Sequence, residues 1–163
     1  MTKKAIISLF KKHRPKTPKE ARALGLSLNC AGSGAFREVY VIGKKLLVVK
    51  FPLLTRSKAD NIDHAQHEIY VIRKINKTQK YAALRPFVPV IHYADYRHGV
   101  LLTDYYYHVG QSKSVLVSQV LSQVADAIFD DTDNMDSVDR DVAGYNIMQT
   151  KAGMFKLIDL GLL

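Results

Sequence analysis

Apolar residues recur at two different spacings along this chain, and the change of spacing predicts its secondary structure. Residues 4–12 carry apolar positions at helical spacing among lysines, which predicts an amphipathic helix. A second, short helix is predicted after Thr17, because threonine suits an N-cap, Pro18 suits the first helical position and Glu20 completes the capping pattern. Gly25 is expected to end this helix. The chain therefore begins with two short helices.

From Ser27 onward the apolar residues alternate or run continuously, as they do in strands. Three strands are predicted in residues 27–36, 37–43 and 44–52, separated by glycine-containing turns. Residues 60–77 return to helical spacing, with isoleucines on one face and charged residues on the other. The first half is thus predicted to be mostly β, with one helix after its third strand.

The second half of the chain contains two predicted hairpins around one helix. Residues 88–97 and 100–108 form the first hairpin, residues 114–129 the helix, and residues 146–149 and 154–159 the closing hairpin. The order is three strands, a helix, two strands, a helix and a hairpin. This order predicts an α+β fold with a β-rich first half and a small helical second half.

Charge and hydropathy narrow the range of partners without naming one. Lysine and arginine number 24 against 15 aspartates and glutamates, and much of this net charge of +9 lies in residues 3–22. Such an excess favours polyanions, which include nucleic acids, anionic membranes and nucleotide phosphates. Nucleic acid is disfavoured because no aromatic stacking series accompanies the basic residues. No apolar run approaches the roughly 20 residues that span a bilayer, so no membrane span is expected.

The single cysteine, Cys30, excludes an internal disulfide and a cysteine-based zinc site. Its place in a predicted strand favours a small core residue over a reactive thiol. One unpaired cysteine agrees with a reducing compartment, and a cytoplasmic location is therefore expected.

Two features of the β-rich half point to phosphate chemistry. The first predicted turn contains Gly32, Ser33 and Gly34, and glycines let backbone amides approach phosphate oxygens; a tight hairpin bend explains them equally well. Lys50 ends an apolar strand, where a buried ammonium is costly unless a carboxylate neutralises it. Glu68 on the next helix is its natural partner. Alternatively, the ammonium of Lys50 reaches water at the strand end.

Three polar residues flank the predicted closing hairpin, namely Asp141 and Asn146 before it and Asp159 after it. Their side-chain oxygens are hard ligands of the kind that Mg²⁺ takes beside phosphate oxygens. Single aspartates near loops are more often caps or turn formers. Here the hairpin is expected to return Asp159 close to Asn146, so that both could face one ion.

In order and spacing, these features resemble the signature motifs of protein kinases, over all but the first 26 residues. The glycine-rich loop corresponds to residues 32–39, the phosphate-binding lysine to Lys50 and its glutamate to Glu68. The catalytic loop corresponds to residues 139–146 and the metal-binding motif to residues 159–161. The resemblance implies a bilobal kinase-like fold, with a five-stranded sheet and one helix in the N-lobe and a much reduced helical C-lobe.

The same resemblance divides the chain into three parts. Residues 1–26 would be a basic helical extension, residues 27–106 the N-lobe and hinge, and residues 107–163 a minimal C-lobe with the catalytic loop and the metal-binding hairpin. Thr103 would be the gatekeeper residue that precedes the hinge.

Each matched residue takes a role from the resemblance. Lys50 and Glu68 would be catalytic, and Asp141 would accept the proton of the substrate hydroxyl. Asn146 and Asp159 would hold Mg²⁺, or Mn²⁺ in its place. The residues implied to bind ATP are Gly32, Ser33, Gly34, Val39, Val48, Lys50, Asp104, Tyr106, Met148 and Ile158.

The sequence also departs from the kinase pattern. Arg37 replaces the third glycine of the loop and is expected to add a cation near the phosphates, and Asp139 replaces a histidine. Only two leucines follow Gly161, so we expect neither an activation segment nor the helices on which larger kinases seat their substrates.

The leading hypothesis is a minimal ATP- and Mg²⁺-dependent kinase of bacterial-effector or phage type that phosphorylates serine or threonine in a protein. It would act in the cytoplasm, that of a host cell if it is a delivered effector. Three alternatives remain: a pseudokinase that binds nucleotide or a partner without catalysis, a kinase for a small molecule, and a basic nucleic-acid-binding module.

Overall fold

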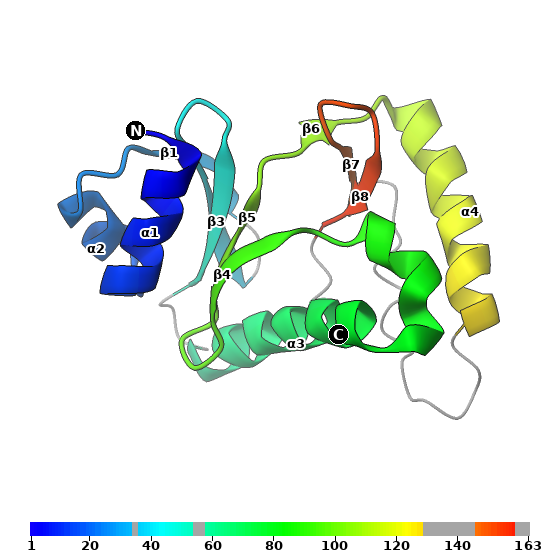
Figure 1. Ribbon diagram of the computed structural model, residues 1–163, viewed down its shortest axis with the longest axis horizontal. Helices are drawn as coiled ribbons and strands as arrows, with labels where there is room; N and C mark the ends of the chain where they lie inside the picture. Colours follow the sequence, from blue (N-terminus) through cyan, green and yellow to red (C-terminus); the bar gives the residue numbers. More distant parts are fainter. Residues whose placement is uncertain (34–35, 54–57, 129–145, 159–163) are drawn as a thin grey trace. The chain divides into compact units, whose positions relative to one another are not determined.

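The computed structural model describes residues 1–33, 36–53, 58–128 and 146–158, which form an α+β fold (Figure 1), as predicted. The predicted helices and strands are present, and their ends differ by a few residues. The elements in chain order are α1 (Lys3–His13), α2 (Pro18–Ala23), β1 (Leu28–Ser33), β2 (Arg37–Ile42), β3 (Leu47–Pro52), α3 (Lys58–Lys77), the 3₁₀ helix η1 (Gln79–Phe87), β4 (Ile91–Asp95), β5 (Val100–Asp104), β6 (Tyr107–His108), α4 (Gln111–Ile128), β7 (Ile147–Gln149) and β8 (Phe155–Leu157).

The chain forms two compact units. Unit 1 comprises residues 1–69 and 90–105, and unit 2 comprises residues 70–89 and 106–163. Residues 1–26, predicted as an extension, are thus part of unit 1, and residues 70–89, predicted within the N-lobe, are part of unit 2.

Unit 1 is built on a five-stranded antiparallel sheet with the strand order β1-β2-β3-β5-β4. Because side chains alternate along a strand, each face of this sheet receives every second residue. One face packs against α1 and α2 and forms the core of the unit. This core consists of Ile6, Phe10, Ala21, Leu26, Tyr40, Ile42, Leu47, Val49, Phe51, Val100 and Leu102.

Each of the two N-terminal helices begins at a threonine cap, and the cap of α2 is the one that the sequence predicts. Thr17 extends its hydroxyl to the backbone N–H of Glu20, which donates to Oγ1 at 3.2 Å, and Pro18 occupies the first turn of α2. Thr2 caps α1 in the same way through the N–H of Ala5. These caps satisfy backbone donors that a helix start otherwise leaves without partners.

The turn between β4 and β5 lies close to the first part of α3. Gly99 adopts a φ of +64°, and a Cβ at this position would lie 2.8 Å from the Cβ of Ala65 and 3.2 Å from a side-chain carbon of Pro52. Only glycine meets both the backbone and the space requirement. This residue therefore lets α3 pack against the end of the hairpin.

Unit 2 contains a small antiparallel sheet with the order β6-β7-β8, together with η1 and α4. Lys156 of β8 is buried, and its Nζ donates to the carbonyls of Pro86 at 2.6 Å and Val88 at 3.0 Å, at the end of η1. The helix η1 was not expected from the sequence, and residues 107–108, predicted as the end of one strand over 100–108, form the separate strand β6 of this sheet. A lysine inside a predicted strand gives no sign that its partners are backbone carbonyls 68 and 70 residues away.

The prediction that Cys30 is a core residue is wrong, because Cys30 is exposed. It lies on β1, which forms an edge of the five-stranded sheet and exposes its residues from Asn29 to Ser33. An edge strand packs against fewer neighbours than an interior one, so its apolar sequence does not ensure burial. None of the helices in the described ranges is long and apolar enough to cross a membrane.

Candidate functional site

Four candidate site residues of unit 1, Gly32, Val39, Val48 and Lys50, lie on the sheet face opposite the α1–α2 core. Residues directly opposite one another on antiparallel strands share a face, and the register aligns Gly32, Val39, Lys50 and Leu101 in one row across β1, β2, β3 and β5. A neighbouring row on the same face contains Val41, Val48 and Thr103. The sheet thus brings together the predicted lysine, a loop glycine, two predicted apolar wall residues and the predicted gatekeeper.

A buried ion pair joins this face to α3. Lys50 Nζ lies 2.8 Å from Glu68 Oε1, and Glu68 is fully buried while Lys50 is 7% exposed. An ammonium and a carboxylate at this depth require close pairing, because burial of either charge alone would be strongly unfavourable. The alternative of a lysine that reaches into water at the strand end is therefore excluded.

Arg37 is the third member of this cluster. Its guanidinium Nη1 forms an ion pair with Oε2 of Glu68, and the residue is 5% exposed. The resemblance to kinases led us to expect a cation near bound phosphates at this position. In the structure the arginine binds the carboxylate that also binds Lys50, so each oxygen of Glu68 pairs with a cation, and its place near a phosphate stays a prediction.

Asp104, predicted to contact a nucleotide through its backbone, ends β5, and its carboxylate contacts a lysine and a histidine side chain. Its Oδ1 pairs with Lys3 of α1 and lies 2.8 Å from Nε2 of His92 on β4. Burial raises the pKa of this carboxyl, but the hydrogen bonds and charges of Lys3 and His92 outweigh burial and lower it below its usual value of 3.8. The contact ties the start of α1 to the end of β5.

The lowered pKa of Asp104 predicts a specific pH dependence of stability. A carboxylate that is more acidic in the folded chain stabilises the fold above its usual pKa, and this contribution is lost as the pH falls below about 4. We expect Asp104→Asn to lower the free energy of unfolding by no more than about 1 kcal/mol at pH 6, because Lys3 is half exposed to solvent. The deficit should shrink at pH 3. Denaturant unfolding at both pH values measures it, and an equal deficit at pH 3 would contradict the assignment.

Unit 2 holds the remaining candidate residues that are described. Asn146 is buried immediately before β7, and its carbonyl accepts a hydrogen bond from the backbone N–H of Ile158 at 2.8 Å. Met148 lies on β7 opposite Lys156 of β8, and Tyr106 is buried just before β6. The predicted hairpin is therefore present and brings the backbones of Asn146 and Ile158 together. Gly34, Asp141 and Asp159 lie outside the described residues.

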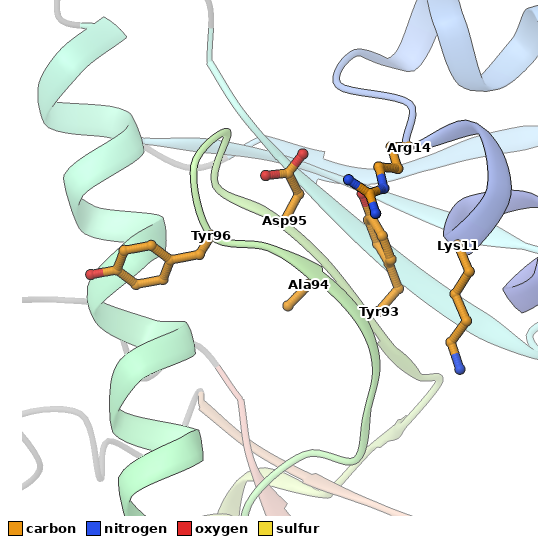
Figure 2. A pocket seen from close by; sticks show the side chains of 6 residues that line it. All are labelled: Lys11, Arg14, Tyr93, Ala94, Asp95 and Tyr96. Atoms are coloured by element: carbon orange, nitrogen blue, oxygen red, sulfur yellow. The ribbon is translucent and has the colours of Figure 1, made fainter.

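An open pocket of about 430 Å³ lies elsewhere on unit 1, and sequence reasoning did not find it. Lys11 and Arg14 line it from the end of α1, and residues 93–96 line it from β4 and the following turn (Figure 2). Burial and the charge of Asp95 raise the pKa of Tyr93, against the opposing charge of Arg14. The basic character of residues 3–22 was visible in the sequence, but their packing beside β4 was not. Among the predicted site residues that the structure describes, none lines this pocket.

No protein-family model matches the sequence, and no curated protein matches it. The functional assignment therefore depends on the residues and their geometry.

Proposed function

We propose that this chain is a kinase with a bilobal kinase-like fold, which transfers the γ-phosphoryl group of ATP to a serine or threonine hydroxyl of a protein. The observation that supports the proposal is the buried Lys50–Glu68 pair on the sheet face that also carries Gly32, Val39 and Val48. Hairpin packing alone does not require a buried lysine at this point, and an apolar residue would be less costly. A lysine held by a carboxylate is suited to meet phosphate oxygens.

In this proposal the residues of unit 1 bind the nucleotide. The backbone amides near Gly32 and Ser33 and the ammonium of Lys50 would meet the phosphates, while Val39 and Val48, both partly buried, would offer apolar surface to the base. Adenine would also meet backbone groups of Asp104.

The donor set for a metal consists of hard oxygen ligands. The side-chain oxygens of Asn146 and Asp159 suit Mg²⁺, with Mn²⁺ as a substitute. The backbone N–H of Ile158 donates a hydrogen bond to the carbonyl of Asn146, which holds the residue before Asp159 beside Asn146. When bound, the ion supplies positive charge that offsets the charge of the transferred group. Asp141 would orient the acceptor hydroxyl and accept its proton.

Incubation of the purified chain with γ-labelled ATP and Mg²⁺, in buffer and in a cell lysate, tests this proposal. We expect label on serine or threonine of a protein, and a rate about 10² to 10⁴-fold lower for Asp141→Ala, the usual contribution of a positioned acid or base. The exposed Asp63 of α3 provides the matched control, since Asp63→Ala should label at the rate of the unmodified chain.

The other outcomes separate the alternatives. Label found only on small molecules would indicate a small-molecule kinase. No label, together with Mg²⁺-dependent protection by ATP against thermal unfolding, would indicate a nucleotide-binding pseudokinase. The absence of both label and protection would refute the nucleotide site itself.

A further inference from the structure

Arg37 occupies a position where the kinase pattern has a glycine, and its side chain is buried instead of lying at the loop surface. In the sheet register Arg37 faces Pro52, and Val39 faces Lys50. Arg37 and Lys50 are therefore diagonal neighbours on one face, a separation that long side chains bridge. Both cations reach the same carboxylate, Glu68, from two adjacent strands.

The residue before Arg37 contacts the same helix one turn earlier. The ring of Phe36 stacks on His64 with the ring centroids 4.1 Å apart and the planes 11° from parallel. His64 and Glu68 are four residues apart and thus lie on one face of α3. Phe36, just before β2, and Arg37, the first residue of β2, therefore both contact one face of this helix, through a ring stack and an ion pair.

We propose that Arg37 is a positioning residue, which fixes the carboxylate of Glu68 by its Oε2 so that Oε1 is held toward Lys50. Guanidinium is planar, permanently charged and directional, so it restricts the orientation of a carboxylate more than a lysine ammonium does. The register Arg37–Pro52 and the burial of all three side chains support this role. The effect of Arg37 on catalysis rests on the proposed kinase function, whereas its effect on the position of Lys50 does not.

The direct readout is the rate at which an amine-reactive probe modifies Lys50 in the absence of nucleotide, located by mass spectrometry. In Arg37→Met the carboxylate loses one of its two cations and can reorient, so Lys50 is held less firmly. We expect Lys50 to be modified about tenfold faster in this variant, in line with the loss of a hydrogen bond to a charged group. Arg37→Lys keeps the positive charge but replaces the planar, directional guanidinium with an ammonium. We therefore expect Lys50 to be modified at a rate between those of the unmodified chain and Arg37→Met.

Arg97→Met is the matched control, because Arg97 is exposed in the turn between β4 and β5. Modification of Lys50 at the unmodified rate in both Arg37 variants would overturn the proposal. If Arg37→Met does not fold, Arg37→Lys alone tests the proposal, and modification of its Lys50 at the unmodified rate would also overturn the proposal.

A kinetic readout separates positioning from a merely structural role. If the chain transfers phosphate, Arg37→Met should raise KM for ATP as well as lower kcat, whereas a smaller fraction of folded protein would lower the apparent kcat alone. A chain without transferase activity would refute the proposed function and leave the Lys50 modification test intact. An active chain whose Lys50 reactivity does not depend on Arg37 would refute the positioning role alone.

Discussion

Asp159→Ala is expected to abolish Mg²⁺-dependent phosphoryl transfer while the chain stays folded. Metal coordination supplies several kcal/mol of charge stabilisation in such reactions, and each 1.36 kcal/mol is a factor of ten in rate. The loss should therefore be about 10³-fold or more. The hydrogen bond from Ile158 to Asn146 supports the assignment, because it holds the chain next to Asp159 against the other proposed ligand.

The measurement is the ATP turnover of Asp159→Ala at saturating Mg²⁺. Asp63→Ala, which removes an exposed aspartate of the same chain, is the control. Thermal unfolding without nucleotide should give the same midpoint for Asp159→Ala and the unmodified chain. With Mg²⁺ and ATP added, only the unmodified chain and the control should be stabilised, since ligands stabilise the state that binds them. Turnover at the unmodified rate in Asp159→Ala would contradict the proposal that Asp159 holds the metal.

Glu68→Ala should produce the largest loss of stability among single substitutions in the candidate site. Glu68 is fully buried and carries two cations, Arg37 and Lys50, on its two oxygens. Removal of the carboxylate leaves two buried positive charges next to each other and takes away the negative charge that both contact. Removal of one partner of a buried ion pair costs about 3–5 kcal/mol, and we expect a loss in this range in denaturant unfolding.

Two further variants make this prediction specific. Asp63→Ala, on the exposed face of the same helix, should change the free energy of unfolding by less than about 0.5 kcal/mol. The triple variant Arg37→Met, Lys50→Met and Glu68→Leu removes all three charges together, and it should recover much of the lost stability because apolar side chains replace buried ions well. The recovered stability should not restore phosphoryl transfer. A loss below about 1 kcal/mol in Glu68→Ala would mean that the cluster is not a structural centre of unit 1.

Local sequence signals specify most of the secondary structure. Thr17 and Pro18 predict the start of α2 because capping depends on a few neighbouring backbone groups, and the structure confirms it. The spacing of apolar residues predicts α3 and the strands of the five-stranded sheet for the same reason, since each period depends on residues close in sequence.

The candidate site was predictable where burial created an obvious need. Lys50 ends an apolar run of residues, so either a carboxylate partner or an ammonium that reaches water was expected, and the structure shows that Glu68 on the following helix is its partner. Its second partner, Arg37, was expected near phosphates. Nothing in the sequence indicates that the guanidinium of Arg37 also pairs with Glu68 of α3. That contact depends on the strand register and on the position of α3.

The sequence by itself determined the α+β class and the start of α2, because these depend on local periodicity and capping, and it offered the pairing of Lys50 with Glu68 as one of two possibilities. Only the tertiary structure decided that Cys30 lies on an exposed edge, that Lys156 binds the carbonyls of η1 and Val88, and that Lys3 and His92 share Asp104. The contacts of Lys156 and Asp104 each join a side chain to groups on another element, and the exposure of Cys30 depends on which strands pair. Periodicity tells which face of an element a residue occupies, but the partner on that face is set by how the elements pack.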